Sequence, residues 1–172
     1  RLRGNDDATI KDVMSVCWRL FTLDEDMVES YLEHLVSLDQ SPINEAVFGL
    51  INKIGRYGKN MNRLISLYKA AKTEDAKISR YEFLEQAINF DSNFVATELS
   101  NAISTQLASY ERKGAGSFSI DYETEQVYDA LQKKTPDLAY EISLKAVHEI
   151  FDKTLLENSD RNFSSSWESY TY

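Results

Sequence analysis

Two histidines and one short glycine turn are the residues of this 172-residue chain whose types could support catalysis or ligand binding. His148 precedes Asp152 by about one helical turn, so this pair could act as a general base. No residue at a recognisable spacing supplies a nucleophile or an oxyanion site. The alternative is that His148 and Asp152 have only a structural role at the edge of the core. His34 has no Cys or acidic ligand at a metal-binding spacing, and Gly114–Gly116 is too short for a dinucleotide loop. We therefore predict a protein that is not an enzyme and uses no metal or cofactor.

A basic segment stands out in a chain with 19 basic and 28 acidic residues and a net charge of -9. Between Ala46 and Thr73 there is no Asp or Glu, although Lys and Arg recur throughout. Such a patch could receive an acidic partner, a phosphate or a nucleic-acid backbone. Alternatively, it could pair internally with the acidic helix expected over residues 24–35. The candidate binding residues at this corner, which flank the turn at Gly55–Gly58, are Lys53, Arg56, Tyr57, Lys59 and Arg63.

The C-terminal segment differs in composition from the rest of the chain. Residues 158–172 are rich in Ser, lack helical periodicity and contain several large aromatic side chains. Because aromatic anchors contribute much of the binding energy at interfaces, Trp167 and Tyr170 are further candidates for binding. Alternatively, the C-terminal segment docks on its own domain or has no role in binding. We divide the chain into a helical domain, 7–157, and a tail, 158–172.

Apolar side chains recur at spacings of three and four residues along most of the chain, which is typical of amphipathic helices. The low content of Gly (6) and Pro (2) favours the same class. Thr22–Glu25 and Ser79–Glu82 match the capping box that begins helices, and Gly55 and Gly58 are expected to end one in the left-handed conformation. We predict an all-α fold, a single bundle of about eight helices. Further helix starts are expected at Ser41-Pro42, Asp91 or Ser92, Asp121 and Thr135-Pro136.

Composition also limits the compartment and the partners. The acidic balance argues against a general nucleic-acid binder. A single cysteine, Cys17, excludes an internal disulfide, and no apolar run is long enough to span a membrane. We expect a cytoplasmic protein with a protein partner, and the oligomeric state stays open.

Two loops resemble those of EF-hand proteins over residues 59–133. In the first, Ile78 matches the central apolar position and Glu82 the acidic position four residues later. In the second, Gly116 matches the turn glycine and Phe118 the central apolar position. The resemblance implies a pair of hands joined by a very short two-stranded ribbon between Ile78 and Phe118.

The positions that bind calcium in that family are not preserved in this chain. Ala71 and Thr73 replace ligands of the first loop, and Lys113 and Tyr122 replace ligands of the second. Because a Ca²⁺ site needs several oxygen ligands that converge on one point, the resemblance implies a metal-free pair. An ordinary capping box ahead of an amphipathic helix is the alternative for the first loop.

The start of the chain resembles the secreted effectors of oomycete pathogens. Those proteins carry Arg-x-Leu-Arg ahead of a small all-α domain, and Arg1-Leu2-Arg3 would complete this motif if Arg preceded it. Trp18 and Val28 are similar to the Trp-bearing helix pair of that family. The resemblance implies an effector that acts in the host cytoplasm by binding a target protein.

Our first functional hypothesis is a protein-interaction domain that uses either the 53–63 corner or a groove between the fourth and seventh helices. An effector or inhibitor that binds a target protein is the second hypothesis, and an enzyme of unrecognised class is the third. The groove hypothesis predicts an exposed apolar patch. Burial of Phe83, Phe94 and Phe118 in one core would contradict it.

Overall fold

Short polar segments divide the chain into helices. The computed structural model describes residues 7–72, 81–108 and 120–167, with side chains up to residue 152. In these ranges, the polar segments separate eight α-helices and one 3₁₀ turn. The described ranges contain no strand, so the predicted all-α class is confirmed. The elements are α1 (Asp7–Phe21), α2 (Glu25–Val36), α3 (Ser41–Ile54), η1 (Gly55–Tyr57), α4 (Met61–Ala71), α5 (Tyr81–Ala87), α6 (Ser92–Ala108), α7 (Tyr122–Lys134) and α8 (Pro136–Trp167).

Several helix starts follow the predicted local signals. Asp91 Oδ1 accepts a hydrogen bond from the backbone N–H of Phe94 at 2.9 Å, and Asp121 Oδ1 accepts one from Thr124 at 2.9 Å. Both carboxylates satisfy donors that the first turn of a helix leaves unpaired. Pro136 begins α8 as expected, because a first-turn residue needs no N–H donor.

The predicted capping box at Thr22–Glu25 is wrong. Asp24 is the N-cap of α2, and its Oδ1 accepts the N–H of Met27 at 3.0 Å. Glu25 instead accepts two backbone N–H groups ahead of α4, from Lys59 at 2.6 Å and Asn60 at 3.1 Å. A partner 34 residues away therefore displaces the local pairing that the sequence pattern suggested.

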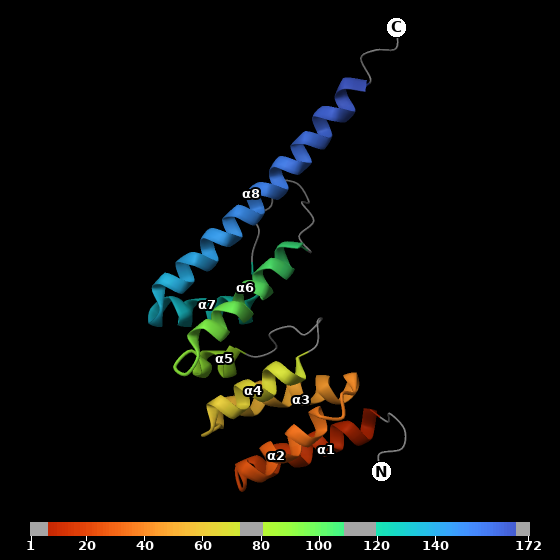
Figure 1. Ribbon diagram of the computed structural model, residues 1–172, viewed down its shortest axis with the longest axis vertical. Coiled ribbons are helices and arrows are strands. Elements are labelled where there is room, and N and C mark those ends of the chain that lie inside the picture. The colour runs from red at the N-terminus through yellow and green to blue at the C-terminus, as the bar shows by residue number, and fades with distance from the viewer. Residues whose placement is uncertain (1–6, 73–80, 109–119, 168–172) are drawn as a thin grey trace.

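The helices form two groups (Figure 1). The groups meet at a cluster of aromatic side chains. In the first group, α3 contacts α1, α2 and α4, and in the second, α7 contacts α5, α6 and α8. At the junction, the Tyr68 ring centroid lies 4.6 Å from that of Phe48, 5.2 Å from that of Phe83 and 5.4 Å from that of Phe94. All four rings are buried. Phe83 and Phe94, two of the three rings on which the groove hypothesis depends, are buried here, and the third, Phe118, lies outside the described residues, so the groove stays a hypothesis.

Gly55 allows the two groups to approach closely. Its φ of -57° and ψ of -33° are right-handed helical values, and Gly58 has a φ of -69°, so the expected left-handed helix end is wrong. The physical reason for glycine at position 55 is steric. A Cβ at Gly55 would lie 2.1 Å from Cδ2 of Phe83, which packs directly over this backbone.

The last helix, α8, is 32 residues long and extends beyond the other helices (Figure 1). It continues through residues 158–167, where the sequence lacks periodicity and no helix was expected. Helix elongation adds one backbone hydrogen bond per residue once a helix has begun, so this part needs no apolar stripe. The predicted ribbon between Ile78 and Phe118 lies outside the described residues.

None of the described helices combines the length and the apolar character that crossing a bilayer requires.

Candidate functional site

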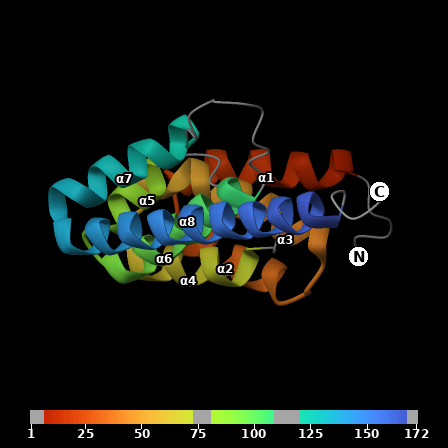
Figure 2. The ribbon, with the colours of Figure 1, turned by 90° about the horizontal axis from the view of Figure 1, so that it is seen from above.

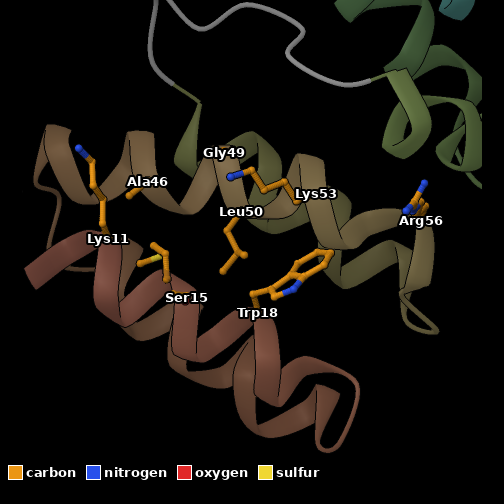
Figure 3. A pocket seen from close by; sticks show the side chains of 9 residues that line it. Lys11, Ser15, Trp18, Ala46, Gly49, Leu50, Lys53 and Arg56 are labelled. Carbon is orange, nitrogen blue, oxygen red and sulfur yellow. The ribbon is translucent and has the colours of Figure 1, made fainter. Parts of the chain in front are cut away.

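A groove with a volume of about 660 Å³ lies between α1 and α3. Each of the two helices lines it at positions i, i+3, i+4 and i+7, the spacing that gathers side chains on one helical face. Residue Arg56 of η1 completes the lining (Figure 3). The lining residues are Lys11, Met14, Ser15 and Trp18 from α1, and Ala46, Gly49, Leu50 and Lys53 from α3.

The middle of the groove is apolar and open. Trp18 lies between the two helices near Leu50 (Figure 3), and 41% of its surface remains exposed. A Cβ at Gly49 would meet no described atom within 4 Å, so the missing side chain leaves space in the groove. An apolar side chain of a ligand could therefore contact Trp18 and Leu50 without displacing any part of the fold.

The rim of the groove is positively charged. Lys11, Lys53 and Arg56 belong to the lining, which includes no carboxylate among the described residues. Neither Lys11 nor Lys53 has an ion-pair partner in the described part of the chain. In a chain with a net charge of -9, this rim is a local site that attracts negative charge.

Arg56 and Tyr57, both predicted as binding residues, are held together at one end of the groove. The Arg56 guanidinium lies 4.5 Å from the centre of the Tyr57 ring, and its Nη1 lies 3.6 Å from Oε1 of Glu82. Tyr57 in turn packs edge-on against Trp18, with the ring centroids 6.1 Å apart. These contacts position an aromatic pair, half exposed to solvent, beside the cationic rim.

Lys59, which was also predicted, does not line the groove. Its backbone N–H binds Glu25, and its side chain is exposed, with no ion pair among the described residues. Lys59 therefore belongs to the same corner but lies outside the binding surface that Lys53 and Arg56 share.

Arg63, the last of the predicted binding residues at this corner, is engaged by side chains of α2. Its Nε and Nη2 donate to the two carboxylate oxygens of Glu33 at 2.6 and 2.7 Å, its Nη1 donates to Glu29 at 3.2 Å, and its Nη2 also donates to Ser30 at 2.8 Å. We call these four residues the α2–α4 clamp. For Arg63, the structure shows internal pairing with the acidic helix, which was the alternative to an exposed basic patch. The pairing forms because α4 packs against the acidic side of α2.

The pKa values of the two carboxyl groups in the clamp are shifted in opposite directions, by different causes. The hydrogen bonds from Arg63 lower the pKa of Glu33. Burial raises the pKa of Glu29 from its usual 4.5 to about 7; the Glu25 carboxylate adds to this increase and Arg63 opposes it. The Glu29 side chain is fully buried, and its Oε1 has no hydrogen-bond partner in the described residues.

This burial predicts a measurable pH dependence of stability. Between pH 4.5 and about 7, the folded chain binds the Glu29 proton more tightly than the unfolded chain, so this group makes folding less favourable as pH rises. Glu29→Gln removes the titration and should gain about 2 kcal/mol relative to the wild type between pH 5 and pH 8. Urea unfolding across this range measures the difference, and Glu45→Gln, at an exposed carboxylate, is the control. If the free energy of unfolding varied with pH in the same way in Glu29→Gln and in the wild type, the raised pKa of Glu29 would be contradicted.

The remaining candidates are two aromatic residues near the C-terminus and two histidines. Trp167 is the last residue of α8, and its side chain lies outside the described set, as does all of Tyr170. His34 and His148 are both exposed and lie on different helices, α2 and α8. The described residues contain no group of three or more His, Cys, Asp or Glu side chains that could hold a metal ion.

No family model, curated protein sequence or solved structure matches this chain. The chemistry of the groove is therefore the basis for a functional proposal. It combines an open apolar centre, an exposed indole ring and cations without carboxylates in the lining.

Sequence reasoning did not identify the contribution of α1 to this site. Lys11, Met14, Ser15 and Trp18 are spaced for one helical face, and this face borders the apolar stripe formed by Val13 and Cys17. A large aromatic residue placed beside the core stripe was the available signal. Trp18 contributes to a groove only because α3 lies opposite α1, and no local sequence pattern encodes that arrangement.

Proposed function

We propose that this chain is a non-catalytic protein-interaction domain whose groove between α1 and α3 binds an acidic segment of a partner protein. The observation that supports the proposal is the charge of the groove. Lys11, Lys53 and Arg56 line it without a carboxylate among the described residues, although the chain as a whole is strongly acidic.

The geometry suggests how such a segment would bind. One apolar side chain of the ligand would occupy the space above Gly49 and contact Trp18 and Leu50. Carboxylates on either side of it would pair with Lys11 and Lys53, which have no competing ion pair in the described residues. Exposed Trp residues surrounded by charge are frequent sources of binding energy at interfaces, and the cations add charge complementarity and faster association.

A peptide titration tests this proposal. The probe is a short fluorescent peptide with one Leu flanked by Asp and Glu, compared with the same peptide carrying Asn and Gln. Fluorescence anisotropy should show micromolar affinity for the acidic peptide, decreasing as salt is added, and at least roughly tenfold weaker binding of the neutral one, which corresponds to about 1.4 kcal/mol.

Two variants and a control localise the binding. Gly49→Phe should fill the groove and weaken binding by roughly tenfold or more, because the new ring takes the space of the ligand side chain. Lys53→Glu should weaken it as strongly by reversing one charge. Lys59→Glu changes the same charge outside the lining and should retain the wild-type affinity within about twofold. Equal losses for Lys53→Glu and Lys59→Glu, or preferential binding of single-stranded RNA, would contradict the proposal.

A further inference from the structure

The helix α8 has two apolar faces, and only one of them is covered. Ala139 and Ile142 are buried, on the side where α8 contacts α6 and α7. The opposite side carries four large apolar residues, which are 45% to 68% exposed. These outward residues are Tyr140, Leu144, Val147 and Phe151.

The spacing of the outward residues is that of a helix–helix contact stripe. Steps of four, three and four residues from Tyr140 to Phe151 keep the side chains on one side of an α-helix. At a rise of about 1.5 Å per residue, the stripe is roughly 16 Å long, or three turns. An amphipathic helix in a monomer normally buries its apolar stripe and exposes its polar side. Here a helix on the outside of the molecule exposes a second stripe. Figure 1 shows α8 on the outer side of the second group of helices, and in Figure 2, seen from above, it lies in front of the other helices.

Acidic side chains follow one edge of this stripe. Asp137, Glu141 and Asp152 lie on the same edge by helical spacing, and all three are exposed. None of the three has an ion-pair partner in the described residues. The nearest cation on α8, Lys145, is engaged by Ser100 at 3.0 Å and by Glu149 at 3.9 Å. Three carboxylates and a single, engaged cation give this edge a net negative charge among the described residues.

We propose that the outward face of α8 docks a basic amphipathic helix of a partner protein. The apolar stripe would pack against a matching stripe on that helix, and Asp137, Glu141 and Asp152 would pair with its Lys or Arg residues. Charge pairs that flank such a stripe determine partner choice in paired helices.

A second copy of this chain fits the face less well. Antiparallel pairing of two α8 helices would set the acidic edge of one against the acidic edge of the other, and like charges at these positions are unfavourable. The net charge of -9 on each copy adds to this repulsion.

This surface is independent of the groove between α1 and α3. Figure 1 places α8 at the opposite end of the molecule from α1. The two surfaces also prefer opposite charges, because the groove is cationic and the edge of α8 is acidic.

The test uses a designed helical peptide of about three heptads, with Leu in the stripe and Lys and Arg on its edges. A matched peptide carries Glu in place of Lys and Arg. The basic peptide should bind the full chain with micromolar affinity, and the acidic peptide at least roughly tenfold more weakly. Glu141→Lys should weaken binding of the basic peptide and strengthen binding of the acidic one.

Variants of the stripe complete the experiment. Leu144→Gln/Val147→Gln changes only exposed side chains and should weaken binding of the basic peptide by roughly tenfold or more, while circular dichroism and the Tm confirm that the variant folds. Gly49→Phe should bind the basic peptide like the wild type, which separates this proposal from the groove. Three outcomes would overturn it: equal binding of both peptides, full binding by the double variant, or a wild-type dimer that the double variant abolishes.

Discussion

Replacing Arg63 with Met is expected to lower the free energy of unfolding by roughly 3–5 kcal/mol, the cost of leaving a buried charged group, here Glu29, without its partner. The guanidinium fills two roles, since it binds both oxygens of Glu33 and is a hydrogen-bond partner of the buried Glu29. Without it, Glu29 would be a buried carboxyl group with no compensating cation, and the clamp between α2 and α4 would be lost. Chemical unfolding near neutral pH, where Glu29 is partly ionised, measures the effect.

Two further variants make this prediction specific. Arg56→Met removes a cation whose pair with Glu82 is 3.6 Å long and partly exposed, so its cost should be about 0–1 kcal/mol. Glu29→Leu/Arg63→Met removes both partners of the 3.2 Å pair and should recover much of the stability lost in the single variant, because no buried carboxyl group is left without its partner. Similar costs for Arg63→Met and Arg56→Met would mean that the clamp does not stabilise the fold.

Gly55→Ala is expected to destabilise the chain by roughly 2–3 kcal/mol, although alanine normally favours helical conformations. The added methyl group would lie 2.1 Å from Cδ2 and 2.8 Å from Cγ of Phe83, whose side chain is fully buried. Phe83 cannot move away freely, because its ring also packs against Tyr68 with the centroids 5.2 Å apart. The Tm and the urea midpoint should both decrease.

Gly49→Ala is the matched control for this change. Gly49 lies in the interior of α3, and its added Cβ would meet no described atom, so the substitution should stabilise the chain by about 0.5–1 kcal/mol. In a double-mutant cycle, Phe83→Leu should make Gly55→Ala less costly, since the smaller side chain relieves the overlap. Additive effects of Gly55→Ala and Phe83→Leu would show that the steric account is wrong.

The sequence predicted those parts of the fold that depend on neighbouring residues. Asp91 and Asp121 cap their helices because the donor and acceptor are three residues apart, and the apolar periodicity predicted the all-α class. Glu25 was misassigned because its acceptor oxygen binds N–H groups near residue 60, across a tertiary contact. Local patterns encode the first kind of bond and do not encode the second.

In the candidate site, too, the sequence predicted the local features and did not predict those that depend on tertiary contacts. Lys53 and Arg63 belong to one basic run in the sequence, yet Lys53 lines the groove and Arg63 is bound by the acidic side of α2. Which cation remains available depends on which helix packs against it. Trp18 stands next to Cys17 of a core stripe in the sequence, but its place in the lining of the groove depends on the position of α3.

The start of α5 has a consequence for the order in which the chain assembles. The backbone N–H of Tyr81 donates to Oε2 of Glu123 at 2.8 Å, a partner 42 residues further along the chain. A seven-residue helix does not persist in water by itself. During synthesis, α5 therefore has to wait until α7 has emerged before its first turn is satisfied and Phe83 is fixed over Gly55. We therefore expect the contact of Phe83 with Gly55, which joins the two groups of helices, to form only after α7 has been made.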